Sequence, residues 1–434
     1  MISSSVWPRV RTISKSLSLV FFVALLVTGA GKPEACRSPL SVLPAAAHPL
    51  PQAGDGNGVT VLENAVEYSF AQHVTFTLRA TANADIEQLY LFLQAPGDRQ
   101  TRSETISIHP SQTITVEHTY DVRLSPLPPF AVVDFWWQLE VAGETITIPV
   151  ETFTYQDNRF RWETLTGTSA SGESIGIHWI QGQGNPVFAQ TALDTARNGL
   201  DAITPILNAP ISAVDVYIYD SPHNLNAAMA LTGREWAAGQ AHPELGVALV
   251  AIPPTEGYTT HMTRYIPHEI THLLLYRVVG ATGYPFVPEW LDEGLATASE
   301  LMPTVEYDLA LEQARLQGTL IPLETLCTPF SPDYQTALLS YAESGSVVRF
   351  ILEEYGAQGI RDLLAAYAGG ASCSSGVRQA LHISLNQLEA AWKTSLDPQA
   401  AHKATIREVA LWLSFPLFGV LITLLMAGYT LRKP

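Results

Sequence analysis

Residues 266–275 (IPHEITHLLL) contain the pattern His-Glu-x-x-His. Residues four apart lie on one face of an α-helix, so His268 and His272 can direct two imidazole nitrogens at a single ion. Zinc binds neutral imidazole nitrogens well, and Glu269 is placed to reach a water molecule on such a metal. Apolar neighbours can bury the helix, where three ionisable groups are costly unless they serve a purpose. The segment therefore predicts a buried helix with two metal ligands and a general base.

A third ligand is available downstream, in residues 288–296 (PEWLDEGLA). A catalytic zinc site usually has three protein ligands and an open position for water. Glu293 follows His272 by 21 positions (293 − 272), and Gly280 and Pro285 lie between them, where the chain can turn. A second helix could then run back past the first and bring Glu293 beside the two histidines. The sequence thus predicts a zinc (Zn2+) site made of two histidines and one glutamate.

Together, these two segments resemble the gluzincin group of zinc metallopeptidases, and within it the bacterial peptidase MA-like domain most closely. The resemblance extends over about residues 160–396, because residues 340–356 (SYAESGSVVRFILEEYG) are similar to a helix that follows the site in that family. It implies that Glu293 is the third zinc ligand and that Glu269 takes a proton from the attacking water. It also makes Tyr341 a candidate donor to the oxyanion of the tetrahedral intermediate, the alternative being a tyrosine packed between helices. The implied activity is the hydrolysis of peptide bonds in a peptide or protein substrate.

The chain departs from the patterns of that group at two places. Related aminopeptidases carry a Gly-x-Met-Glu-Asn segment for the free amine of the substrate, and this sequence has none upstream of the motif. Where thermolysin-type enzymes have an aspartate four residues after the third ligand, this chain has Thr297. Asp292 and Glu300 are the candidates for orienting the histidines, since metal-bound histidines normally have such partners. His261 could face the cleft or be an ordinary polar residue.

The chain divides into regions of different secondary structure, and its predicted fold class is α+β. Residues 57–155 contain about seven short β-rich segments separated by turn residues, which predicts an immunoglobulin-like β-sandwich domain. Residues 156–400 are expected to form the gluzincin-type metallopeptidase domain, with a small mixed sheet followed by a helical subdomain. Residues 247–252 are a predicted strand of that sheet, and they could offer a sheet edge to an extended peptide.

Both ends of the chain contain apolar segments. Residues 1–31 combine basic residues, an apolar run and small residues, the order of a secretory signal peptide that could also remain as an N-terminal anchor. Residues 32–56, rich in Pro, Ala and Gly, are a predicted linker. Residues 409–429 are apolar over about the 20 residues that a transmembrane helix requires, with a buried core helix as the alternative. These features predict a single-pass protein of the cell membrane whose catalytic domain is extracytoplasmic.

Composition narrows the function classes further. The 434 residues carry a formal net charge of −17, so attraction to the phosphates of nucleic acid is not expected. Of the three cysteines, Cys327 and Cys373 lie in the catalytic half and could pair in an exported domain. Two other functions stay open: a catalytically inactive metallopeptidase-like module that binds a cell-surface partner, and a zinc hydrolase of another substrate class. The intact set of ligands and base favours the peptidase.

Overall fold

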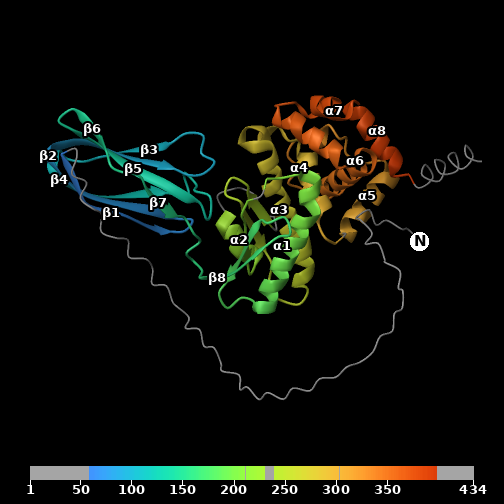
Figure 1. The fold of residues 1–434 in the computed structure, drawn as a ribbon, viewed down its shortest axis with the longest axis horizontal. Coiled ribbons are helices and arrows are strands. Elements are labelled where there is room, and N and C mark those ends of the chain that lie inside the picture. Colours follow the sequence, from blue (N-terminus) through green and yellow to red (C-terminus); the bar gives the residue numbers. More distant parts are fainter. Residues whose placement is uncertain (1–57, 211, 230–238, 303, 398–434) are drawn as a thin grey trace, which may run out of the picture. The chain divides into compact units, whose positions relative to one another are not determined.

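The computed structural model describes residues 58–397, apart from 211, 230–238 and 303 (Figure 1). Strands precede a helical part along the chain, so the described region has the α+β class that the sequence predicts. Among these described residues, no helix is long and apolar enough to span a bilayer. Three predicted segments lie outside the described residues: the signal peptide or anchor (1–31), the linker (32–56) and the transmembrane helix (409–429).

Seven strands of the described region form the first sheet, in which every pairing is antiparallel. They are β1 (Val59–Ser69), β2 (His73–Gln94), β3 (Arg102–Ile106), β4 (Ser111–Asp121), β5 (Val132–Val141), β6 (Glu144–Thr147) and β7 (Glu151–Thr154). Burial alternates along the first half of β2, where Val74, Phe76 and Leu78 are fully buried. This period of two residues is that of a strand with one face on an apolar core.

β2 differs from the prediction, because the two strands expected at 74–78 and 89–93 are parts of one long strand. Its first half pairs with β1 and β4, and its second half pairs with β3 and β5. Residues 82–87 stay extended between the halves instead of turning, since they contain neither Gly nor Pro. All seven strands are therefore joined in one hydrogen-bonded network through β2, and the immunoglobulin-like arrangement stays a prediction.

A second sheet, of five strands in the described region, follows along the chain. In spatial order its strands are β11 (Gly239–His242), β12 (Val247–Ala251), β10 (Val214–Tyr219), β9 (Ser174–Ile180) and β8 (Trp162–Thr168). β12, β10 and β9 are parallel, whereas β11 and β8 pair antiparallel at the two edges. The sheet is therefore mixed, as expected, and α1 (Pro186–Leu207) and α2 (Pro222–Met229) connect its strands.

The prediction that residues 247–252 offer a sheet edge is wrong. β12 has β10 on one side and β11 on the other, and every side chain of β12 is buried. A strand that is apolar on both faces is typical of the interior of a sheet. The edge belongs instead to β11, which is short and partly polar and therefore gives little sequence signal.

Helices dominate after residue 258, as the sequence predicts. They are α3 (Tyr258–Gly283), α4 (Glu289–Ser299), α5 (Val305–Gln317), α6 (Tyr334–Ala368), α7 (Cys373–Leu381) and α8 (Leu385–Ser395). The regular path of α3 is broken at Gly280, whose φ of 72° lies in the left-handed region that suits glycine. A 3-10 turn (Tyr284–Phe286) follows before α4 begins. The turn that the sequence predicts between the two motifs is therefore present.

α4 packs closely against α6 because a glycine faces the contact on each helix. A Cβ atom on Gly294 would lie 2.6 Å from the backbone oxygen of Ser344, and one on Gly345 would lie 2.8 Å from Thr297. Real side chains do not approach their neighbours so closely, so this separation of the helices depends on glycine. Gly294 directly follows Glu293, and the contact therefore also positions the residue that the sequence selects as third ligand.

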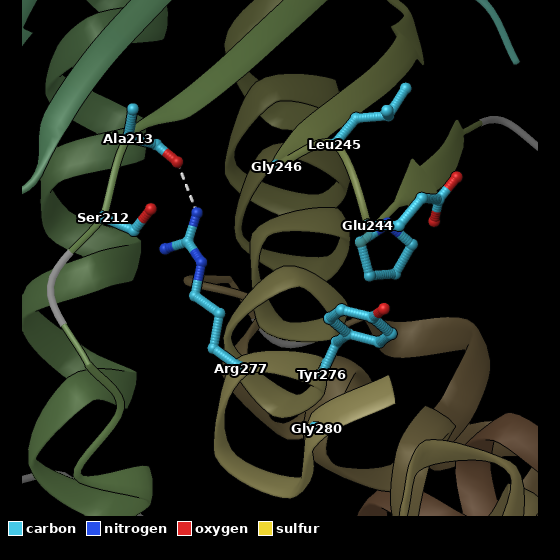
Figure 2. A pocket seen from close by; sticks show the side chains of 9 residues that line it. Ser212, Ala213, Glu244, Leu245, Gly246, Tyr276, Arg277 and Gly280 are labelled. Carbon is cyan, nitrogen blue, oxygen red and sulfur yellow. Dashed lines mark hydrogen bonds between the residues drawn. The ribbon is translucent and has the colours of Figure 1, made fainter. Parts of the chain in front are cut away.

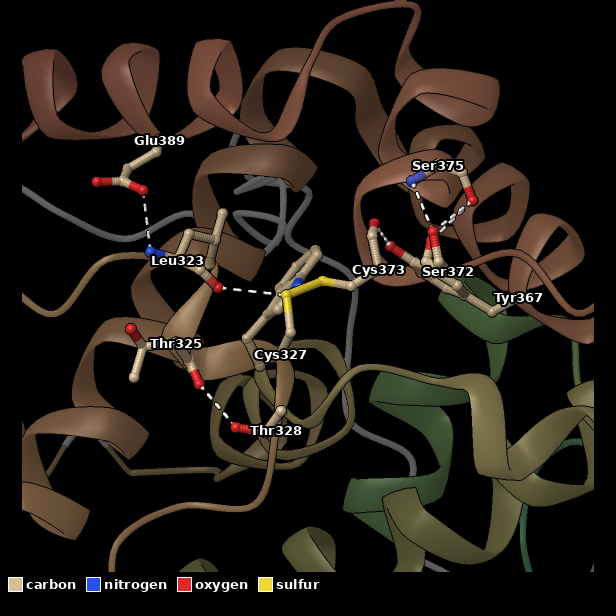
Figure 3. Close-up of a disulfide and its surroundings, with 10 residues drawn as sticks. Leu323, Thr325, Cys327, Thr328, Tyr367, Ser372, Cys373, Ser375 and Glu389 are labelled. Carbon is tan, nitrogen blue, oxygen red and sulfur yellow. Dashed lines mark hydrogen bonds between the residues drawn. A yellow bond between two sulfur atoms is a disulfide. The ribbon is translucent and has the colours of Figure 1, made fainter.

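Cys327 and Cys373 form a disulfide, so the pairing that the sequence allows is confirmed (Figure 3). The disulfide joins a 3-10 turn (Thr325–Cys327) to the first residue of α7. The indole nitrogen of Trp290, a fully buried residue of α4, donates a hydrogen bond to the Cys373 sulfur at 3.4 Å. The disulfide is therefore in contact with the helix that carries Glu293.

Candidate metal centre

Three side chains from two helices converge at one point. His268 and His272 come from α3, and Glu293 comes from α4. The Nε2 atoms of His268 and His272 lie 3.3 and 3.6 Å from Oε2 of Glu293. The ligand atoms all lie within 4.8 Å of one another, and no other group of this kind occurs among the described residues. The structure thus brings together the three residues that the sequence selects.

The spacing of these atoms fits a small tetrahedral metal ion. Zinc binds nitrogen and oxygen ligands at about 2.0–2.2 Å, and tetrahedral angles then separate two ligand atoms by about 3.4 Å. The two distances to Glu293, 3.3 and 3.6 Å, lie on either side of that value. Two imidazoles and one carboxylate are also a donor set of catalytic zinc sites, with a fourth position for water. The residues present therefore fit zinc.

Asp292 contacts His272 on the side away from the proposed ion. Its Oδ1 lies 2.6 Å from Nδ1 of His272, and its Oδ2 accepts a hydrogen bond from the Tyr284 hydroxyl at 2.9 Å. A carboxylate at Nδ1 favours the tautomer with its proton there, which leaves the Nε2 lone pair for a metal. Burial, together with the charge of Asp292, raises the pKa of Tyr284, so its hydroxyl remains a donor.

Glu300 takes the corresponding position beside His268. Its Oε1 lies 3.4 Å from Nδ1 of His268, and its Oε2 lies 3.7 Å from Nε of Arg264. Arg264 also donates a hydrogen bond to the Tyr307 hydroxyl at 2.7 Å. The two carboxylates that the sequence offers as orienting groups are therefore both beside a histidine, one for each ring. The sequence alone does not show which carboxylate lies beside which histidine, because this depends on how α4 crosses α3.

The site has an excess of negative charge that suits a cation. Burial alone would lower the pKa of His268, but the nearby carboxylates of Glu293 and Glu300 outweigh it and raise that pKa well above its ordinary value. Burial also opposes protonation of His272, whereas the charges of Asp292 and Glu293 raise its pKa to about 9. Since the carboxylates favour positive charge at both rings, a divalent ion can take the place of the protons.

Pro267 helps to fix α4 against α3. Proline has no amide hydrogen, so the carbonyl of Thr263, one helical turn earlier, loses its usual partner within the helix. The amide of Leu301, just after α4, donates to that carbonyl at 2.9 Å. The hydroxyl oxygen of Ser299 lies 3.1 Å from the carbonyl of Pro267, within hydrogen-bond distance. These contacts hold the C-terminal end of α4 on the helix that carries both histidines.

Glu269 is buried beside the edge strand of the second sheet. A Cβ atom on Gly239, the first residue of β11, would lie 2.4 Å from Oε1 of Glu269, so this carboxylate lies directly against the strand. No motif identifies Gly239 in the sequence. Its one signal is general, since a glycine inside a strand often marks the close approach of another group.

Tyr341 and His261 occupy different places relative to the possible metal ligands. The ring centre of Tyr341, in α6, lies 6.1 Å from that of His268, and its ring packs edge-on against Phe330. His261 is exposed and stacks on Tyr265, two helical turns before His268. Tyr341 therefore lies beside the site, whereas His261 is outside the group of possible ligands.

A pocket of about 400 Å³ lies at the C-terminal half of α3 (Figure 2). Tyr276 and Arg277 line it, and Arg277 donates a hydrogen bond to the carbonyl of Ala213. None of the three possible metal ligands lines it. Tyr276 packs edge-on against Tyr284, which in turn supports Asp292. The pocket is therefore connected to the metal site through packing but is not part of it.

Residues 195–398 match the family model described as the Peptidase MA superfamily. This part of the chain is similar to the peptidase MA superfamily. The matched residues include both histidines, Glu269 and Glu293, so this part is a metallopeptidase-like module. The resemblance that the two motifs carry is thereby confirmed.

Among solved structures, the chain is similar to two crystal structures of OgpA from Akkermansia muciniphila. One is the wild-type protein, and the other is a catalytically inactive form in complex with an O-glycopeptide substrate, glycodrosocin. Both comparisons give 14% identity and a TM-score of 0.19, and both cover 25% of this chain. They cover 32% and 31% of the OgpA chains, so the chain spans about a third of their length. No curated protein matches the chain.

Proposed function

We propose that the metallopeptidase-like module is a zinc metallopeptidase that hydrolyses peptide bonds in a peptide or protein substrate. The observation that carries this proposal is the convergence of His268, His272 and Glu293 at the spacing of a tetrahedral zinc site. The match of residues 195–398 to the model of the Peptidase MA superfamily supports the same class of reaction.

In this proposal, Nε2 of His268, Nε2 of His272 and a carboxylate oxygen of Glu293 hold the ion. When bound, zinc polarises the scissile carbonyl group and makes a water molecule more acidic. Asp292 keeps a proton on Nδ1 of His272, and Glu300 does the same for His268. Both Nε2 lone pairs therefore stay directed at the ion.

Glu269 is the proposed general base. It is buried, and it lies close enough to His268 for its charge to raise the pKa of that ring. Its carboxylate accepts a proton from the attacking water and passes it to the nitrogen of the leaving amine. Tyr341, whose ring lies beside His268, is the proposed donor of a hydrogen bond to the oxyanion.

The edge of β11 supports the binding of an extended peptide. Within the described residues, β11 pairs with β12 and with no other strand, and it lies against Glu269. A peptide that adds to this edge through main-chain hydrogen bonds would pass beside the general base. Residues 239–242 contain no carboxylate that could bind the free amine of a substrate. Cleavage within a chain is therefore favoured over removal of an N-terminal residue, and we propose an endopeptidase.

We also propose that the module works outside the cytoplasm, anchored to the cell membrane. The disulfide between Cys327 and Cys373 supports export, because structural disulfides persist in oxidising compartments. Apolar residues 409–429, outside the described region, are the proposed single-pass anchor. Protease added to intact cells should remove the module and leave a C-terminal fragment in the membrane. A module that is protected until the cells are opened would contradict this location.

Zinc content and peptide cleavage test the proposed activity in the full-length protein purified in detergent. Elemental analysis should find one zinc per chain, and Glu293→Ala should lose it. The wild type should cleave casein, and Glu269→Gln should keep its zinc while cleavage falls by about 10²–10⁴-fold, the usual contribution of a general base. A protein that holds zinc but cleaves nothing would support the inactive binding module instead. A wild type that never binds zinc would contradict the site itself.

A further inference from the structure

We infer that Gly239 is a positioning residue for Glu269: its lack of a side chain sets where the carboxylate of the proposed base stands. Gly239 begins β11, the edge strand, opposite Val250 of β12. A Cβ atom there would lie 2.4 Å from Oε1, 2.8 Å from Cδ and 2.9 Å from Cγ of Glu269. Any other residue would therefore overlap the outer half of this one side chain.

The lack of space for a side chain, and not the backbone conformation, explains why residue 239 is a glycine. Gly239 is not among the glycines of the described region that have a positive φ, whereas Gly246, in the turn after β11, has a φ of 71°. A residue with an ordinary strand conformation can carry any side chain, and glycine weakens a strand by entropy and lost packing. The three nearest atoms to the added Cβ all belong to Glu269. The nearest obstacle to a side chain at this position is therefore Glu269.

The expected result of adding a methyl group follows from which atoms it meets. They are the far end of a flexible side chain and not backbone, so the strand can stay in place while the carboxylate rotates away. A catalytic group that moves by about 1 Å can lose about 100-fold in rate, even when the fold is unchanged. Gly239→Ala should therefore leave zinc in place and reduce turnover.

This inference rests on the proposed function for its effect on turnover, but the contact itself can be tested without activity. The experiment is a double-mutant cycle in the full-length protein with Gly239→Ala, Glu269→Asp and the double variant. Aspartate is one methylene shorter and makes room for the new Cβ atom. The melting temperatures are compared in chelator-treated protein. The change caused by Gly239→Ala should be more positive in the Glu269→Asp background than in the wild type, by a few degrees.

Turnover is measured in the same cycle with zinc restored. Gly239→Ala alone should lower kcat by about 10–100-fold at unchanged zinc content, and the loss in the double variant should be smaller than the product of the two single losses. Gly369→Ala, at the end of α6, is the control, since a Cβ there approaches no atom closer than 3.3 Å and no part of the site. Additive changes in both melting temperature and kcat would overturn the inference. Coupled melting temperatures in a protein that holds zinc but cleaves nothing would keep the contact and contradict the proposed function instead.

Discussion

The first sheet and the metallopeptidase-like module bury different kinds of side chain. In residues 58–156 every buried residue is hydrophobic, and none carries a carboxylate, an imidazole or a basic group. The module buries Glu269, Glu293 and Glu343 as well as His272. An ionisable group inside a protein costs free energy unless partners compensate for the lost water.

This difference supports the proposal that the module, and not the first sheet, carries the chemistry. The hydrophobic interior of the first sheet is what stability alone would require, and its alternating pattern is that of a strand with one face on a core. The module keeps the buried carboxylates of Glu269 and Glu293 where they can face an ion or a reacting group. Three substitutions, from the largest expected effect to the smallest, would break or sharpen this comparison.

Phe76→Ala tests whether the first sheet serves stability alone. Phe76 is fully buried and packs against Phe135 and Phe153. Its removal should lower the free energy of unfolding by about 3–5 kcal/mol, as large aromatic deletions in cores do. Zinc content should not change. Phe92→Ala, on the same strand but only half-buried, is the matched control with a smaller loss in chemical denaturation. Loss of zinc in Phe76→Ala would show that zinc binding by the module depends on the packing of the first sheet.

Glu343→Gln tests the cost of a buried charge that is not a possible metal ligand. Burial raises the pKa of Glu343 from 4.5 to about 7, although its carboxylate accepts a hydrogen bond from the amide of Ile321. Between these two pH values the folded protein holds a proton that the unfolded chain has released, so stability falls as pH rises through this window. Above pH 7, Glu343→Gln should be more stable than the wild type by about 3 kcal/mol.

The gain from Glu343→Gln should disappear below pH 4.5, where both states of the wild type are protonated. Urea unfolding across the pH range measures this difference. A variant that is less stable than the wild type at pH 8 would mean that the ionised carboxylate is compensated by its surroundings. In that case Glu343 would no longer be an example of a costly buried charge.

Asp292→Asn tests the support of the metal ligands. The carboxylate of Asp292 lies 2.6 Å from Nδ1 of His272, and the amide of asparagine cannot hold that proton equally well. Zinc affinity should fall by about 10–100-fold, the usual effect of removing such a partner. Competition with a chromogenic chelator measures it, with Asp308→Asn on the exposed side of α5 as control. Equal zinc affinities for the wild type and Asp292→Asn would contradict the role of Asp292.

The sequence predicts the convergence of the three possible metal ligands better than it predicts the sheets. The spacing of His268 and His272 requires only that their segment be helical, and the position of Glu293 requires only one turn between two helices. The continuous strand β2 was not predicted, because the strongly apolar segments 74–78 and 89–93 look like separate strands when alanines and polar residues predominate between them. The edge strand was missed because four mixed residues carry no strand pattern. Gly239 could not be identified without the contact that it makes.

Pro267 has a consequence for how the ligand set could be lost. A residue with an amide hydrogen at this position would offer the carbonyl of Thr263 a partner inside α3 and so compete with the amide of Leu301. α3 would become a more regular helix, and the end of α4 would lose an attachment. The position of Glu293 relative to the two histidines thus depends on Pro267, because the missing amide hydrogen of proline leaves the carbonyl of Thr263 available to the amide of Leu301. A substitution that improves one helix on its own could in this way uncouple two of them.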